Sequence, residues 1–172
     1  MRVVALRNRE ATAHANADLV LSFASGGMDA VSQVVEQSDL LVLALPQTGS
    51  TGQLVEQRMI DKLRPNAVVV NVGRGSALDE AALASRLLET AAAGDRGVCA
   101  ALDVFSQEPL PVESQLWSVP VNRLLLSPHT MDQTSCYWER AVRVWETNAQ
   151  LFLENGADCH HIGPLVDLDL EY

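Results

Sequence analysis

The stretch Asn66–Gly75, with the sequence NAVVVNVGRG, decides the fold. Three successive valines, ended by Asn71, predict a short strand that is buried on both faces. Such near-continuous β-branched runs are typical of parallel sheets covered by helices. Gly73-Arg74-Gly75 follows directly, at the carboxyl end of the strand, where open α/β sheets bind their ligands. The arginine offers a planar fork suited to a carboxylate or carbonyl oxygen, and the alternative is a helix-entry turn with a surface arginine.

The composition indicates a globular protein without an anionic polymer as partner. The chain has 172 residues, of which 48% are hydrophobic and 20% charged, enough for one domain with a core. Its net charge of −10 argues against nucleic acid or an anionic membrane surface as a partner. The apolar runs are too short for a signal peptide or a membrane span, so we expect a cytoplasmic protein.

Cysteine and histidine usage predicts neither disulfides nor a metal site. Cys99, Cys136 and Cys159 are scattered and lack the spacing of a thiol pair, which favours reduced thiols. The pair His160-His161 has no third ligand nearby, so we interpret it as part of a solvated tail.

Apolar runs alternate with amphipathic segments, as in a doubly wound parallel α/β sheet. We expect five buried strands, at residues 1–6, 39–45, 67–71, 97–102 and 121–126. We expect four helices. The first is capped by Asp29, the second spans Ser50–Leu63, the third starts near Asp79, and the fourth runs from about Gln133 to Glu154. Residues 10–27 and 106–120 are predicted to be irregular connections.

Polar residues follow these strands and would share one edge of the sheet. Arg74, Glu108 and His129 lie in separate strand-end segments that can converge. Histidine donates protons near neutral pH, a nearby glutamate favours its imidazolium form, and arginine holds a carboxylate. This set suits reduction of a 2-keto acid in which His129 protonates the carbonyl oxygen.

Each of these residues also has an ordinary structural interpretation. His129 could cap the last helix region, Glu108 could be a solvated loop acid, and Asp103 could be a turn former. Their joint occurrence at strand ends is what favours a site.

Four motifs carry a family resemblance. They are SDLLVLALPQTGSTGQLV at 38–55, VVVNVGRGSALDEAAL at 68–83, ALDVFSQEPLP at 101–111 and LLLSPHT at 124–130. In this order they closely resemble the signatures of the D-isomer-specific 2-hydroxyacid dehydrogenases, including glyoxylate/hydroxypyruvate reductase-like members. The resemblance covers residues 1 to about 156, and four motifs in register are far more specific than a lone glycine motif.

The resemblance implies hydride transfer between a nicotinamide cofactor and a small 2-keto or 2-hydroxy acid. It makes Arg74 the arginine that binds substrate, Glu108 the acid that partners histidine, and His129 the general acid/base. These three are the predicted catalytic residues.

The resemblance also implies cofactor contacts. Asp103 matches the aspartate that contacts the nicotinamide carboxamide, and the other matched positions, besides Arg74 and His129 again, are Leu45, Pro46, Val72 and Gly73. Arg7 stands where NAD-preferring members carry an aspartate, so NADP is favoured over NAD, with help from Arg9. Alternatively, Arg7 only ends an edge strand.

The chain departs from the family in one large respect. Family members place a substrate-side domain, a first strand and a Gly-rich loop before the part that matches here, and these 172 residues contain no G-x-G-x-x-G. We therefore expect an incomplete doubly wound sheet lacking that strand, with a partial NAD(P)-binding domain at 1–156 and a tail at 157–172. The strands at Met1 and Val68 would leave a gap or pair directly.

Two functions follow from these observations. The first is a dehydrogenase of which these residues form one part, weak in cofactor binding and turnover when alone. The second is a non-catalytic remnant that acts as an interaction or regulatory module, for example by pairing with a full-length relative. A homodimer is expected for the family, and the particular 2-keto acid is not specified by the sequence.

Overall fold

The computed structural model describes residues 1–8, 14–94 and 97–156. The chain divides into two compact units, Met1–Pro128 and His129–Tyr172. Among the described residues, unit 1 carries every strand and every buried side chain, and unit 2 carries one long helix. Arg9, Cys159, the pair His160-His161 and the predicted tail at 157–172 lie outside the described residues.

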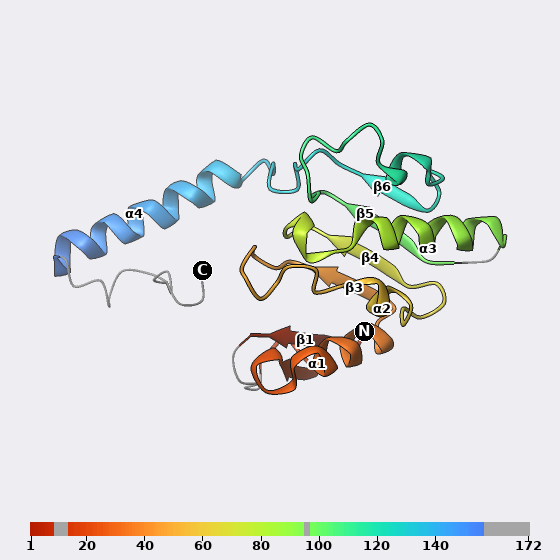
Figure 1. The fold of residues 1–172 in the computed structure, drawn as a ribbon. Coiled ribbons are helices and arrows are strands. Elements are labelled where there is room, and N and C mark those ends of the chain that lie inside the picture. The colour runs from red at the N-terminus through yellow and green to blue at the C-terminus, as the bar shows by residue number, and fades with distance from the viewer. Residues whose placement is uncertain (9–13, 95–96, 157–172) are drawn as a thin grey trace. The chain divides into compact units, whose positions relative to one another are not determined.

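Parallel strands form the centre of unit 1 (Figure 1). The strands are β1 (Val4–Arg7), β2 (Leu19–Ser22), β3 (Leu40–Leu43), β4 (Val68–Asn71), β5 (Cys99–Leu102) and β6 (Leu124–Leu126). They form a two-stranded sheet, β1-β2, and a four-stranded sheet, β3-β4-β5-β6, in which every pairing is parallel. The predicted doubly wound parallel α/β fold is confirmed.

Three helices follow strands of unit 1 and lie along one side of them (Figure 1): α1 (Phe23–Gln37), α2 (Gln57–Ile60) and α3 (Glu80–Ala92). Unit 1 also has the short 3-10 turns η1 (Gly75–Ala77) and η2 (Gln115–Ser118), and unit 2 has the helix α4 (Tyr137–Asn155). α1 packs on β1, β2 and α2, and α2 packs on α3. The core lies between these helices and the alternate strand residues that point toward them, such as Leu41, Val69 and Leu102.

The prediction of an irregular connection at 10–27 is wrong for residues 19–27. Leu19–Ser22 pairs with β1 in register, Val4 opposite Leu19, and α1 follows at once. The hydroxyl of Ser22 caps α1 by accepting from the backbone N–H of Ser25, so Asp29 does not cap the start of the helix. The helical backbone is kinked at Gly27, whose φ is 52°, and Asp29 lies in the first turn after this kink. A four-residue strand has too little pattern to be recognised in an Ala- and Ser-rich segment. Whether the segment forms a strand depends on its pairing partner, here β1.

The predicted helix at Ser50–Leu63 is confirmed only for the single turn α2. Instead of opening a helix, residues 48–51 form a turn in which the Thr51 hydroxyl accepts from the Thr48 N–H and donates to the Pro46 carbonyl. The turn continues through Gln53, whose φ is 49°, and Val55 then forms a parallel bridge with Leu78. The N–H groups of Gln53 and Val55 donate to the carbonyls of Ser76 and Ala77. These long-range bonds outweigh the local capping signal.

The strands that flank the gap also differ from the prediction. β3 pairs with β4 on one side, so the open space lies between β1 and β3 and not beside Val68. The described residues between β1 and β2, which are 8 and 14–18, contain no helix. The predicted loop 106–120 contains the turn η2.

The later helices agree with the sequence. The Asp79 carboxylate caps α3 by accepting from the Ala82 N–H at 3.0 Å. α4 begins at Tyr137, four residues later than the predicted start near Gln133, and Gly156, with a φ of 64°, ends it.

Candidate active site

The ends of four neighbouring strands meet at one edge of the larger sheet. The Val72 N–H donates to the Leu43 carbonyl, and the Asp103 N–H donates to the Asn71 carbonyl, each at 3.0 Å. The Ser127 N–H donates to the Leu102 carbonyl at 3.0 Å. These bonds continue the ladders past the strands, so the turns after β3, β4, β5 and β6 lie side by side.

Two glycines allow these turns to approach closely. A Cβ at Gly73 would lie 2.5 Å from the backbone nitrogen of Leu45. A Cβ at Gly75 would lie 1.9 Å from the backbone carbon of Phe105. Both distances are shorter than any side chain can tolerate, so only glycine lets the Arg74 turn sit between the loops after β3 and β5.

Asn71 fixes the shape of that turn. Its side chain is fully buried, its Oδ1 accepts from the Gly73 N–H at 3.1 Å, and its Nδ2 donates to the Arg74 carbonyl at 3.0 Å. The Arg74 side chain is exposed, and its Nη1 donates to the Gly73 carbonyl at 2.8 Å. The sequence predicts Asn71 only as the end of a strand, although an asparagine two residues before Gly-Arg-Gly is also a turn signal.

Asp103 is a buried carboxylate at the end of β5. It is 3% exposed, and its Oδ1 accepts from the Ser127 hydroxyl at 2.6 Å. Burial of a charged group requires partners of this kind. Ser127 was not predicted as a site residue, and its position directly after the last strand is the signal that could have found it.

Glu108 lies on an anchored loop. Its Oε1 accepts from the Phe105 N–H at 3.0 Å, and the Ser106 N–H donates to the Glu80 carboxylate. These bonds hold the loop to its own start and to α3, while the Glu108 side chain remains exposed.

The structure does not bring all predicted residues together. His129 is exposed, has a φ of 54° and is the first residue of unit 2, so its convergence with Arg74 and Glu108 stays a prediction. Arg7 is exposed at the end of β1, in the separate two-stranded sheet. Leu45 packs against the core, and Pro46 follows it at the surface.

Comparison with known proteins identifies the family. Residues 1–130 match the model described as the NAD binding domain of D-isomer specific 2-hydroxyacid dehydrogenases. The chain belongs to this family. A solved family structure from Aeromonas salmonicida is 30% identical in sequence to this chain and has a TM-score of 0.67. The matched region covers 90% of this chain and 45% of that one. Another, from Xanthobacter autotrophicus in complex with NADPH and MES, is 28% identical with a TM-score of 0.67, over 90% of this chain and 57% of that one.

A curated relative is the glyoxylate/hydroxypyruvate reductase B of Enterobacter agglomerans. It is 39% identical over 97 residues, which are 56% of this chain and 28% of the reductase. The chain thus spans less than two thirds of the length of each of these three proteins. In the part of the chain that the structure describes, no helix has the length and apolar character needed to cross a bilayer.

Proposed function

We propose that this chain forms part of a dehydrogenase that transfers hydride between NAD(P)H and a small 2-keto or 2-hydroxy acid. The observation that carries the proposal is the Arg74 turn, held by the buried Asn71 beside the ends of β3 and β5. A buried amide that shapes a turn presenting an exposed guanidinium is a preorganised anion site. Membership of the family supplies the reaction class.

The residues at this edge fit the nicotinamide end of a dinucleotide. The backbone around Leu45, Val72 and Gly73 offers peptide groups, and the Asp103 carboxylate offers an acceptor suited to a carboxamide. The described residues contain no glycine-rich turn for a pyrophosphate, so that half of the cofactor needs groups from elsewhere. A nicotinamide bound at this edge supplies the hydride.

The chain's own residues would handle charge and protons. Arg74 binds the substrate carboxylate and polarises the neighbouring carbonyl. His129, as imidazolium, gives a ring-nitrogen proton to the carbonyl oxygen during reduction and takes it back during oxidation. Glu108 stabilises the imidazolium and orients the ring.

The same proposal covers cofactor choice and substrate. Arg7 ends β1 as an exposed cation, where a 2′-phosphate would be attracted, and this favours NADPH. The reductases related to this chain suggest glyoxylate and hydroxypyruvate as the first substrates to try.

The test compares this chain with the native protein from its source cells. We expect an intact mass well above 18.6 kDa for the native protein and NADPH-dependent reduction of glyoxylate or hydroxypyruvate. The 172-residue chain alone should show weak NADPH binding and little turnover. In the active native protein, Arg74→Gln should lower kcat/KM by about 10²-fold or more, because an electrostatic group at the reacting centre contributes that much.

Arg123→Gln is the matched control, since Arg123 precedes β6, at the opposite end of the strand from Ser127. Equal losses for both variants would contradict the role of Arg74. Steady turnover by the 172 residues alone would contradict the expected dependence on further residues.

A second candidate function is a non-catalytic interaction module. The observation that favours it is a cavity of about 780 Å³ between β1 and β3, open on the edges of both strands. A native mass equal to that of these residues, together with absent reductase activity, would favour this candidate over the enzyme.

A further inference from the structure

The Asp103 carboxylate is buried at the end of a strand, where a charge is costly. Among the described residues it is the one charged side chain in the buried set, with 3% of its surface exposed. Moving a carboxylate out of water costs free energy unless other groups bond it. Asp103 lies directly after β5, at the sheet edge where parallel α/β sheets bind their ligands. A charge that is costly for stability and stands at this edge indicates a function in binding.

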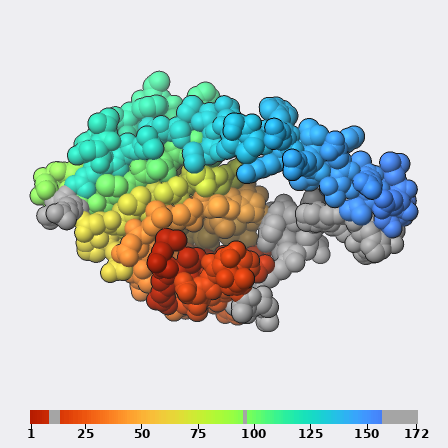
Figure 2. Space-filling view, turned by 180° about the vertical axis from the view of Figure 1, so that it is seen from behind, coloured from red at the N-terminus to blue at the C-terminus, as the bar shows by residue number. Residues whose placement is uncertain are grey.

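The main chain fixes Asp103 beside Ser127. β5 and β6 pair in register, with Leu102 opposite Leu126, so the next pair along the ladder is Asp103 and Ser127. The Asp103 N–H donates to the Asn71 carbonyl and the Ser127 N–H to the Leu102 carbonyl, each at 3.0 Å. The space-filling view shows the green and teal segments that contain these two strands in contact (Figure 2). The backbones of both residues are therefore held by the sheet.

The Ser127 hydroxyl fixes what the main chain leaves loose. The second side-chain torsion of an aspartate joins an sp³ carbon to an sp² carbon and has a broad energy minimum, so the plane of the carboxylate needs an outside partner. The Ser127 hydroxyl donates to Oδ1 of Asp103 at 2.6 Å, within the range of charge-assisted O–H···O⁻ bonds. An ionised carboxylate has about four acceptor sites, so it can accept this bond and further ones at once.

The strand end itself does not require this hydroxyl. Ser127 continues the ladder with its N–H, and an alanine at the same position would make the same backbone bond. Pro128 follows and has no N–H that a side chain would need to satisfy. What the serine side chain adds is the bond to Asp103, and with it a defined orientation of the carboxylate.

We propose that Ser127 is a positioning residue for the cofactor: its hydroxyl holds the Asp103 carboxylate in the orientation that accepts an N–H of the nicotinamide carboxamide. The inference rests on the proposed function and adds a residue to it. A site built around such an acceptor rejects an analogue that lacks the donor, because the buried carboxylate is then left with one bond fewer. Ser127 therefore determines how strongly the protein selects a carboxamide.

The experiment measures this selection in the native protein, expressed at its natural length and without substrate. Isothermal titration calorimetry gives the Kd for NADPH and for its reduced 3-acetylpyridine analogue, in which a methyl group replaces the carboxamide NH₂. We expect the analogue to bind about tenfold more weakly or worse, because a hydrogen bond to a charged group is lost. The ratio of the two Kd values is the readout, since a general loss of structure at this edge would raise both Kd values alike.

Two substitutions at Ser127 test the hydroxyl. Ser127→Ala removes the donor, so the ratio of the Kd values should fall to about threefold or less. Ser127→Thr keeps a hydroxyl and should keep the ratio of the unchanged protein. Circular dichroism checks that each variant folds. If Ser127→Ala does not fold, Ser127→Cys replaces it and should show the same fall, because a thiol is a weak donor.

Ser85→Ala is the matched control. It removes another serine hydroxyl, which donates to the Ala81 carbonyl within α3 at 3.0 Å, and it should leave both Kd values unchanged.

Four outcomes would contradict the proposal. A ratio that Ser127→Ala leaves unchanged would overturn it, even if both Kd values rise, because the bond would then have a structural role alone. A ratio that falls in Ser127→Thr as far as in Ser127→Ala would overturn it as well. A native protein that reduces glyoxylate or hydroxypyruvate but binds both cofactors equally would overturn this inference and leave the proposed function standing. A native protein that binds neither cofactor would contradict the proposed function, and this inference with it.

Discussion

At the scale of single residues, the turn after β4 depends on one buried amide. Asn71 is fully buried, and its side chain bonds both the Gly73 N–H and the Arg74 carbonyl. Asn71 is the last residue of the valine strand β4, so its backbone belongs to the sheet while its side chain bonds the turn. The turn can hold Arg74 at the edge of the sheet only while both of these bonds are made.

We expect Asn71→Ala to lower the free energy of unfolding by about 1–3 kcal/mol, because it leaves the buried Gly73 N–H without its acceptor. Urea denaturation at constant pH measures the change. The control is Asn122→Ala, at an exposed loop position, which should fall within about 0.5 kcal/mol of the unchanged chain. Equal effects of the two substitutions would show that the side-chain bonds of Asn71 add nothing.

The second prediction at this scale concerns a glycine. Gly75→Ala forces a methyl group into the backbone of Phe105 and should cost at least about 3 kcal/mol or prevent folding. Gly49→Ala meets no atom within 4 Å and should cost little. Thermal unfolding compares the two variants, and a Gly75→Ala protein as stable as Gly49→Ala would mean that the two loops do not touch as described.

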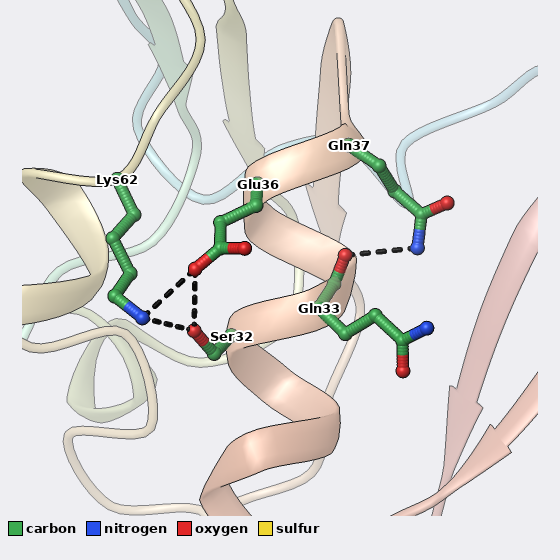
Figure 3. Close-up of polar contacts among 5 residues, drawn as sticks. All are labelled: Ser32, Gln33, Glu36, Gln37 and Lys62. Carbon is green, nitrogen blue, oxygen red and sulfur yellow. Dashed lines mark hydrogen bonds and ion pairs between the residues drawn. The ribbon is translucent and has the colours of Figure 1, made fainter.

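At the scale of elements, a polar cluster ties α1 to the segment after α2 (Figure 3). The Lys62 ammonium bonds the Glu36 carboxylate at 2.8 Å and also contacts the Ser32 hydroxyl, which donates to the same carboxylate. The ammonium, and then the hydroxyl, lower the pKa of Glu36 from its ordinary value. All three side chains are solvent-accessible, so the cluster sets helix position more than stability.

We expect Lys62→Met to raise the pKa of Glu36 back toward its ordinary value, as followed by NMR titration of its side-chain carboxyl. A depressed carboxyl pKa stabilises the fold above the unfolded-state pKa, and this contribution disappears as the pH falls through the lower, folded-state value. Arg58→Met is the control, because that guanidinium pairs with Glu56 instead. An unchanged Glu36 titration in Lys62→Met would contradict the cluster.

At the scale of the whole molecule, the described core belongs to unit 1. Among the residues that the structure describes, the buried ones run from Ser22 to Leu124, and α4 has none. α4 also carries exposed aromatic side chains, including Trp138 and Trp145, on a helix with no described cover. An isolated helix of this length is only marginally stable in water. We therefore expect α4 to contribute little to the stability of unit 1.

We therefore expect a chain shortened to end at Pro128 to keep its free energy of unfolding within about 0.5 kcal/mol in urea, since the described residues of unit 2 contain no buried side chain. The slope of the transition should fall only slightly, because little additional surface becomes exposed. A clearly lower midpoint for the shortened chain would show that α4 supports unit 1.

Local patterns in the sequence predicted much of this arrangement. The valine run of β4, the apolar run of β3 and the capped α3 were all recognisable, because each carries its signal within a few residues. The residue types at the strand ends also predicted a candidate site around Arg74 and Asp103. The family motifs are local in the same sense, and the family they indicated is confirmed.

Contacts between distant residues decided the remainder. β2 exists because β1 pairs with it, and the bridge at Val55 exists because residues 77–78 bond it. The close approach of Gly75 to Phe105 and the bond from Ser127 to Asp103 likewise join residues far apart in the chain. No short window of sequence contains both partners of such a contact, so its free energy appears only once the sheet has brought them together.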